Sequence, residues 1–381
     1  MDSIFAQYIY TGKTLAENSY LHFEQNRVTD ISPQQKADPA GSYHTITPAF
    51  IDPHCHMGMQ RWGEPVSEAE TNERMDSILA LADALDSVQM DDGSFQDSIE
   101  EGVLYSCVMP GSGNIIGGRA AVIRNYGKNT SLALIRKAGV KAAFGYNTMS
   151  ATHWKGKRPY TRMGALALLR HKLYEVKQKT EKLEKASPEK KVEFSLSNEE
   201  QILASILDGR EMLRAHVHKI DDVAALLRLA DEFGLRVSVE HGCDINSVHM
   251  FTELKKRNIP VIYGPMDSFA YKVELKHENW RNTEYLIQSG VRFGLMTDHP
   301  VILQKMLLYQ LRWFLRVGMD KSRAVSIITL ENAHILGIQD LLGSLEHGKL
   351  ASFICWDGDP FSLTSRPAAV YGEGQLIHSL Q

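Results

Sequence analysis

Two pairs of histidines, each with one residue between them, stand at the ends of apolar segments. His54 and His56 follow TPAFIDP, and His216 and His218 end MLRAHVH. Residues two apart on a strand point to the same side, so both imidazoles of a pair can reach one metal ion. With 15 histidines in 381 residues, chance alone gives roughly 0.6 such pairs. The spacing is therefore weak evidence by itself.

Two further segments end in groups that bind metals or transfer protons. His241 follows LRVSVE, and Asp298 follows VRFGLMT. The carboxyl ends of parallel strands meet at one face of a barrel, which would bring these groups together. Imidazoles with one carboxylate suit Zn²⁺ or a similar divalent ion. Because random placement does not favour strand ends, we prefer a shared site to separate core histidines.

The elements that would position these groups are clearest in residues 212–298. Segments 212–218, 235–242, 259–265 and 291–300 have the composition of strands, and helical segments separate them. The helix predicted at 221–234 has an apolar stripe, acidic residues at its start and Gly234 at its end. Such repetition predicts a parallel sheet with crossover helices. Over about 300 residues it favours an α/β fold of the (β/α)₈ TIM-like barrel type over an open sheet.

The two ends of the chain have a different texture. Residues 1–47 and about 345–381 contain short strand-like segments separated by turn residues. Residues 163–207 are rich in helix formers, with a charged middle that predicts a solvated helix pair broken at Pro188. We expect two units: residues 1–47 plus 346–381, and a barrel at residues 48–345.

Composition excludes several classes of protein. There are 42 Lys and Arg against 46 Asp and Glu, a net charge of −4, so binding to nucleic acid through bulk positive charge is excluded. No apolar run is long enough to predict a membrane span, and Asp2 stands where a secretory signal would be basic. The four widely spaced cysteines predict reduced thiols and a cytoplasmic location.

Several segments resemble the amidohydrolase superfamily. They are TPAFIDPHCHMG, LRAHVHKIDDVAALLRLADEFGLRVSVEHG, GVRFGLMTDHPV and ENAHILGI with GSLEHGKLASFICWDGDPF. The segment MPGSGNIIGGRAAVIRNYG is similar to the branch related to imidazolonepropionase. The resemblance implies a distorted (β/α)₈ barrel whose terminal strands join in a small β-sandwich.

The resemblance also implies roles for individual residues. His54, His56 and His216 match metal ligands, and Asp298 matches a residue that is both ligand and general base. His241 matches a histidine that binds a second metal in some relatives and polarises the substrate in others. His218 is a catalytic candidate, with a loop histidine held by the backbone as the alternative.

Tyr146 bears on the number of metal ions. It follows the strand-like run VKAAFG, so its side chain could face the metal. Two dications need a bridging anion, which a neutral phenol supplies poorly. We therefore favour one ion, Zn²⁺ before other divalent metals, with His241 free to donate a hydrogen bond to the substrate. The alternative is that Tyr146 packs outward and another carboxylate bridges two ions.

Loops supply the predicted substrate contacts. Ser112 and Asn114 lie in a loop predicted to cover the substrate, and Lys155, Arg158 and Arg162 form a basic loop that suits a lid or an anion clamp. The other predicted substrate contacts are Arg119, Tyr146 and His299.

Together these features predict a metal-dependent hydrolase that cleaves a C–N bond in a small molecule. A cyclic amide, an amidine or an N-acyl compound fits this chemistry. The alternatives are a deaminase or dipeptidase of the same superfamily, or a catalytically silent metal-binding relative. We expect a small-molecule substrate, no nucleic-acid or membrane partner, and leave a homo-oligomer open.

Overall fold

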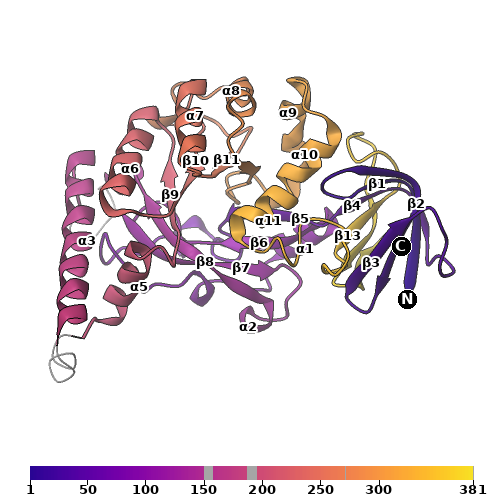
Figure 1. The fold of residues 1–381 in the computed structure, drawn as a ribbon, viewed down its shortest axis with the longest axis horizontal. Helices are drawn as coiled ribbons and strands as arrows, with labels where there is room; N and C mark the ends of the chain where they lie inside the picture. Colours follow the sequence, from indigo (N-terminus) through magenta and orange to yellow (C-terminus); the bar gives the residue numbers. More distant parts are fainter. Residues whose placement is uncertain (150–157, 187–194, 271, 381) are drawn as a thin grey trace.

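The protein contains two β-sheets, one of eight strands and one of seven. The computed structural model describes residues 1–149, 158–186, 195–270 and 272–380. In Figure 1 the helices gather around the eight-stranded sheet, and both chain termini lie in the other sheet.

The eight-stranded sheet nearly closes on itself. Its strands are β5 (Phe50–Cys55), β6 (Val103–Val108), β7 (Ile116–Arg124), β8 (Leu134–Ala143), β9 (Leu213–Val217), β10 (Val237–His241), β11 (Val261–Tyr263) and β12 (Phe293–Leu295), paired in that order. All pairs are parallel except those of β7, which runs antiparallel to β6 and β8. Between the edge strands β5 and β12, the amide of Asn332 donates to Ile51 O at 2.7 Å and to Leu295 O at 3.0 Å.

The strand–helix repeat predicted for residues 212–298 is present. Helices α6 (Ile220–Phe233), α7 (Val248–Lys256) and α8 (Asn282–Ser289) alternate with β9 to β12. The predicted apolar stripe of α6 is buried in the main core, and the helix ends at Gly234, whose φ of 69° suits glycine. Periodicity therefore located this half of the sheet correctly.

The other α-helices of the described residues have between four and 24 residues. They are α1 (Gly93–Glu100), α2 (Thr130–Ala133), α3 (Arg162–Lys185), α5 (Asn198–Leu207), α9 (Arg312–Arg316), α10 (Lys321–Ile327) and α11 (Leu330–Leu336). Helix α5 begins with a capping box between Ser197 and Glu200. Helices α3 and α5 form the predicted charged pair, but Pro188 lies outside the described residues.

The seven-stranded sheet combines strands from both ends of the chain. Its strands are β1 (Asp2–Tyr10), β2 (Leu15–Glu24), β3 (Arg27–Ser32), β4 (Ser42–Pro48), β13 (Phe353–Trp356), β14 (Pro367–Gly372) and β15 (Gln375–Ser379). The order is β15-β14-β13-β4-β1-β2-β3, so the C-terminal strands join at β4. The division into two domains and the sandwich form of the smaller one stay predictions.

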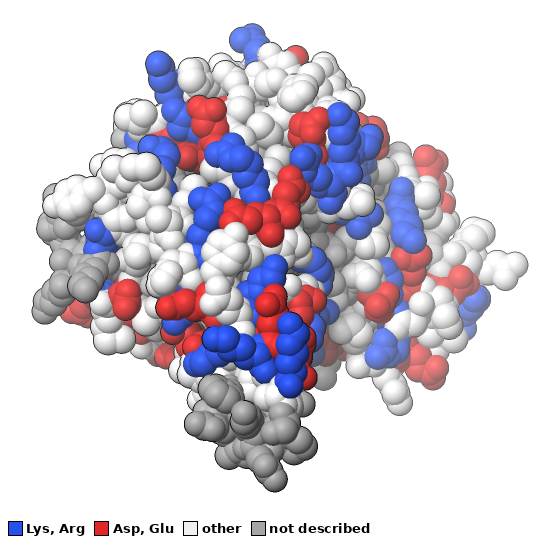
Figure 2. Space-filling view, turned by 60° about the vertical axis from the view of Figure 1, so that its left-hand side comes forward, with Lys and Arg blue, Asp and Glu red and all other residues white. Residues whose placement is uncertain are grey.

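The surface carries charges of both signs (Figure 2), and the cysteines lie in the interior. In Figure 2, acidic and basic side chains lie interspersed across the face shown. All four cysteines are free and buried. Among the helices of the described residues, none is both long and apolar enough to cross a membrane.

Candidate metal centre

The carboxyl ends of the parallel strands bring the predicted ligands together. His54 lies in β5 and His56 directly follows it, while His216 lies in β9 and His241 ends β10. Asp298 lies in the turn after β12, where its backbone N–H donates to His54 O at 3.1 Å. Residues far apart in sequence thus form one cluster, as the barrel geometry requires.

Hydrogen bonds from Nδ1 fix the orientation of three of the imidazoles. Each donates from Nδ1 to an acceptor: His54 to Glu240 Oε2 at 2.8 Å, His56 to Met109 O at 2.7 Å, and His241 to Gly264 O at 3.0 Å. A carbonyl or carboxylate oxygen can only accept, so in the neutral ring Nδ1 carries the hydrogen and Nε2 keeps a lone pair. This arrangement of acceptor, imidazole and free nitrogen is typical of metal-binding histidines.

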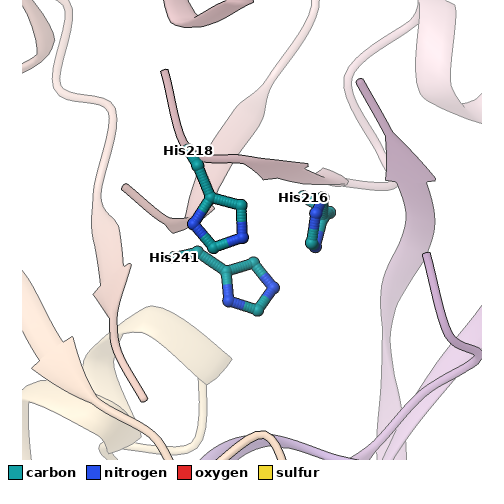
Figure 3. A group of neighbouring side chains, drawn as sticks. All are labelled: His216, His218 and His241. Carbon is teal, nitrogen blue, oxygen red and sulfur yellow. The ribbon is translucent and has the colours of Figure 1, made fainter. Parts of the chain in front are cut away.

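His216, His218 and His241 form a compact group (Figure 3). Their ring centroids are 4.3 to 4.8 Å apart, and all three side chains are buried. His218 Nδ1 and His241 Nε2 have no hydrogen-bond partner among the described residues. Burial lowers the pKa of each of the three imidazoles well below the usual value, so the rings are neutral and able to act as ligands.

Asp298 is the carboxylate of the cluster. Its Oδ1 lies 3.2 Å from His56 Nε2 and 3.5 Å from His54 Nε2, and its φ is 52°. Burial raises its pKa, but the neighbouring His56, His54 and Lys141 outweigh burial and bring the pKa to about 2. The carboxylate is therefore ionised at neutral pH, ready to bind a cation or accept a proton.

Lys141 is a member of this site that sequence reasoning missed. It lies in β8, is fully buried, and places Nζ 2.8 Å from His54 Nε2. Burial lowers its pKa to about 8. The signal in the sequence was a lysine within AGVKAAFG, a run of small and apolar residues where a charge needs a reason.

Two buried residues behind the histidines form an ion pair. Arg214 Nε donates to Glu240 Oε1 at 2.8 Å, and Arg214 Nη2 donates to Pro53 O at 2.9 Å. Burial opposes the ionisation of Glu240, but Arg214 and His54 hold its pKa well below the usual range. The pair fixes the orientation of His54, because Glu240 bonds both partners at once.

Ser112, a predicted substrate contact, lies at the edge of the cluster. Its Oγ accepts from Asn147 Nδ2 at 2.6 Å, and the same nitrogen lies 3.4 Å from His216 Nε2. Asn114 is buried, and its Nδ2 donates to Glu73 O at 2.9 Å and Asp76 O at 2.7 Å. Asn114 therefore holds a neighbouring loop, and its contact with a substrate stays a prediction.

The predicted anion clamp is only partly described. Lys155 lies outside the described residues. Arg158 donates from Nη2 to Gly113 O, and Arg162 pairs with Asp222 at 2.7 Å. Arg162 is thus already matched by a carboxylate, so its role in binding a substrate stays a prediction.

Tyr146 lies near the mouth with half of its surface exposed. Its backbone N–H donates to the buried carboxylate of Glu274, and the tyrosine side chain is 50% exposed rather than buried among the histidines. The group from β8 that faces the histidines is Lys141. The hypothesis that Tyr146 controls the number of metal ions therefore loses its geometric basis.

The side chain of Arg119 lies on the opposite face of the sheet from the histidines. In the β7–β8 register Gly118 is opposite Lys141, whereas Arg119 is opposite Val140. Because neighbouring residues on a strand point to opposite faces, Arg119 lies on the face away from Lys141. The structure does not bring this predicted substrate contact to the cluster.

His299 does lie beside the cluster. It is buried, its backbone carbonyl accepts from His56 N at 2.9 Å, and its Nδ1 accepts from Gln304 N at 3.2 Å. Burial lowers its pKa to about 4, so the ring is neutral.

The donor set fits a divalent metal ion. Two groups offer ligand atoms within 4.8 Å of one another: His216, His218 and His241, and His54, His241 and Asp298. A buried imidazole nitrogen without a partner is unfavourable unless something binds it. A cation beside these imidazoles would provide a partner for His241 Nε2, which has none among the described residues.

Similarity to known proteins agrees with this geometry. The sequence model of the amidohydrolase family matches residues 171–376, and the chain belongs to that family, whose members are hydrolases acting on carbon–nitrogen bonds. The chain is 23% identical to the amidohydrolase TasK of Hapsidospora irregularis over 86% of its own length and 36% of TasK. It therefore spans about a third of that relative.

Two other similarities are informative. An imidazolonepropionase of Acinetobacter baumannii is 32% identical over 88 residues, covering 22% of this chain and 21% of that protein. The crystal structure of an amidohydrolase from Thermotoga maritima MSB8 superimposes with a TM-score of 0.92 at 26% identity, covering all of both chains. The predicted superfamily is confirmed, and the nearly closed sheet is a TIM-like barrel.

Proposed function

We propose that the protein is a metal-dependent amidohydrolase that cleaves a C–N bond of a small molecule, such as a cyclic amide, an amidine or an N-acyl group. The observation that carries the proposal is that the Nε2 atoms of His54, His56 and His241 lie close to one ionised carboxylate, Asp298. Structural histidines do not need this convergence, whereas a hydrolytic metal site does.

We infer that His54, His56, His216, His241 and Asp298 hold the metal, with Zn²⁺ favoured by the nitrogen-rich set. A divalent ion bound there would lower the pKa of a water molecule and polarise the carbonyl or amidine under attack. His241 differs from its expected role, because its Nδ1 hydrogen is already donated to Gly264 O. A neutral His241 therefore offers Nε2 as a ligand and not as a donor to the substrate.

Asp298 is proposed as the proton carrier. Its carboxylate is ionised, lies within 3.5 Å of His54 and His56, and keeps 15% of its side chain exposed. It can accept the proton of an attacking water molecule and then deliver it to the leaving nitrogen. His218 and His299, both buried beside it, would exclude bulk water and contact the substrate.

One metal ion remains the favoured state, and the reason is the charge of Lys141. Lys141 as an ammonium ion adds positive charge 2.8 Å from His54 Nε2 and so opposes a second dication. If the neutral amine combines with carbon dioxide, a carbamate forms with loss of a proton, and that anion could bridge two ions. Lys141, and not Tyr146, is then the residue that sets the metal count.

Turnover by the metal-loaded and metal-free protein tests the proposal. The substrates would be a panel of N-acyl amino acids, dipeptides, cyclic amides and aminopurines, so that deaminase and dipeptidase activity register separately. We expect C–N hydrolysis that requires metal and falls sharply in His56→Ala. Metal binding without turnover of any class would instead identify a silent relative.

The number of metal ions has its own test. Metal bound per chain would be measured with and without bicarbonate, in the natural protein, in Lys141→Met and in Tyr146→Phe. One ion in all samples supports the favoured state. A second ion that appears with bicarbonate and is lost only in Lys141→Met supports the carbamate-bridged state.

A further inference from the structure

A cavity of about 830 Å³ lies at the end of the barrel opposite the histidines. Its wall includes Met212, Arg236, Pro260 and Arg292, the residues that directly precede β9, β10, β11 and β12. The histidines lie at the other ends of β9 and β10. The cavity is therefore separate from the metal centre, and neither the family similarity nor the proposed hydrolase chemistry accounts for it.

The charge of the wall is strongly unbalanced. Seven Lys and Arg side chains line the cavity, against one carboxylate, Glu211. Four of the seven are matched by carboxylates that lie outside the lining: Lys137 with Asp83, Arg210 with Asp208, Arg257 with Glu253 and Asp231, and Arg292 with Glu331. The other three are Arg136, Arg236 and Lys255.

These three cations have no ion pair among the described residues. Both arginines donate only to backbone carbonyls: Arg136 to Gly337 O at 2.5 Å and to Lys137 O at 3.3 Å, and Arg236 to Gly209 O at 2.9 Å. The ammonium of Lys255 lies over Gly290, where an added Cβ would be 2.8 Å from Nζ. All three side chains are exposed. Against Glu211, they leave an excess of two positive charges in a chain whose net charge is −4.

The ends of helices explain part of this pattern. Helix α7 ends at Lys256, and cations in a last turn interact favourably with the helix dipole. The helix dipole would stabilise a lysine at position 255 and one at position 256 alike. It does not explain why only one of the two lines the cavity. Lys255 lines the cavity, whereas Lys256 is outside the lining and pairs with Glu253 at 2.7 Å.

We propose that this cavity binds a small anion carrying at least two negative charges, through Arg136, Arg236 and Lys255. Its volume suits a small-molecule ligand, and the charge excess balances a dianion. Phosphate esters and polycarboxylates share this chemistry. The proposal does not depend on the hydrolase function, because no residue of the metal centre contributes to the wall.

Calorimetric titration with pyrophosphate and, separately, tricarballylate tests the proposal and distinguishes the two anion classes. We expect saturable binding of at least one, weakened roughly tenfold, or about 1.4 kcal/mol, by Lys255→Met and by Arg236→Gln. The matched control is Lys256→Met, which removes a cation from the same helical turn and should leave affinity within about twofold.

Three results would overturn the proposal. One is the absence of saturable binding for both anions at low salt, where screening is weakest. Another is an equal loss in Lys255→Met and Lys256→Met, which would show diffuse attraction only. The third is loss of binding in His56→Ala, which would place the anion on the metal. Circular dichroism of each variant verifies that it is folded.

Discussion

The two sheets differ in whether charged side chains are buried within them. Inside the seven-stranded sheet the buried cluster is apolar, with Ile4, Leu21 and Phe353 among its members. Inside the eight-stranded sheet, Lys141, Arg214 and Glu240 are all buried. Burying charge is unfavourable by several kcal/mol for each ion unless partners are present. The difference shows that the fold buries charged side chains where they hold the groups of the candidate metal centre in place.

The largest expected effect is a loss of kcat in Asp298→Asn. Replacing Asp298 with Asn removes the proton acceptor but keeps the size of the side chain, so kcat should fall by about 10² to 10⁴. Steady-state kinetics on the metal-loaded variant measures the loss. Asp97→Asn, which breaks only a surface pair with Lys305, is the control and should keep full activity. Near-normal kcat in Asp298→Asn would remove Asp298 from the proton-carrier role.

The next prediction concerns the buried support. Glu240→Gln leaves Arg214 buried without a counter-charge, so the free energy of unfolding should fall by about 3–5 kcal/mol. Metal affinity should also fall about 10- to 100-fold, because the acceptor of His54 loses its negative charge. Urea unfolding and metal titration measure the two effects.

A surface glutamate provides the comparison for Glu240. Glu253→Gln removes partners of Lys256 and Arg257 at the protein surface and should change stability by less than about 1 kcal/mol. Equal effects of the two substitutions would show that the Glu240–Arg214 pair has no special role.

In the apolar sheet a substitution should affect stability alone. Ile4→Val deletes one buried methylene and should lower the free energy of unfolding by about 0.5–1.5 kcal/mol. Activity at a temperature where the variant is folded should not change. A drop in kcat at full metal occupancy would show that the terminal sheet takes part in positioning the site.

A separate prediction concerns pH. Burial raises the pKa of Glu278 from 4.5 to about 7, and the nearby Asp244 adds to this. The folded state therefore binds a proton more tightly than the unfolded state, and the resulting stability is lost as pH rises from about 4.5 to 7. Glu278→Gln should flatten the pH dependence of the unfolding free energy over that window. An unchanged slope would mean that Glu278 titrates normally in the folded protein.

Sequence reasoning located one half of the fold and the outer parts of the site. The alternation of strands and helices placed β9 to β12, and each predicted ligand lies at or just beyond a strand end. The antiparallel strand β7 was not predicted, because local sequence gives composition and not the direction of pairing.

The buried partners were harder to see. Glu240 and Arg214 each stand next to apolar residues in their strands, and which face they occupy depends on register. Tyr146 and Lys141 belong to the same run of sequence, but Lys141 is the residue whose buried side chain contacts His54. Long-range contacts such as Glu240 with His54 join residues 186 positions apart, which no local pattern encodes.

Elemental analysis of protein prepared without chelator, paired with activity before and after metal removal, tests the central claim most directly. The account predicts at least one equivalent of a divalent metal, Zn²⁺ favoured, held by the natural protein and lost in His56→Ala and His216→Ala. It also predicts that removal abolishes turnover and that added metal restores it. Protein that is free of metal and still fully active would contradict the account.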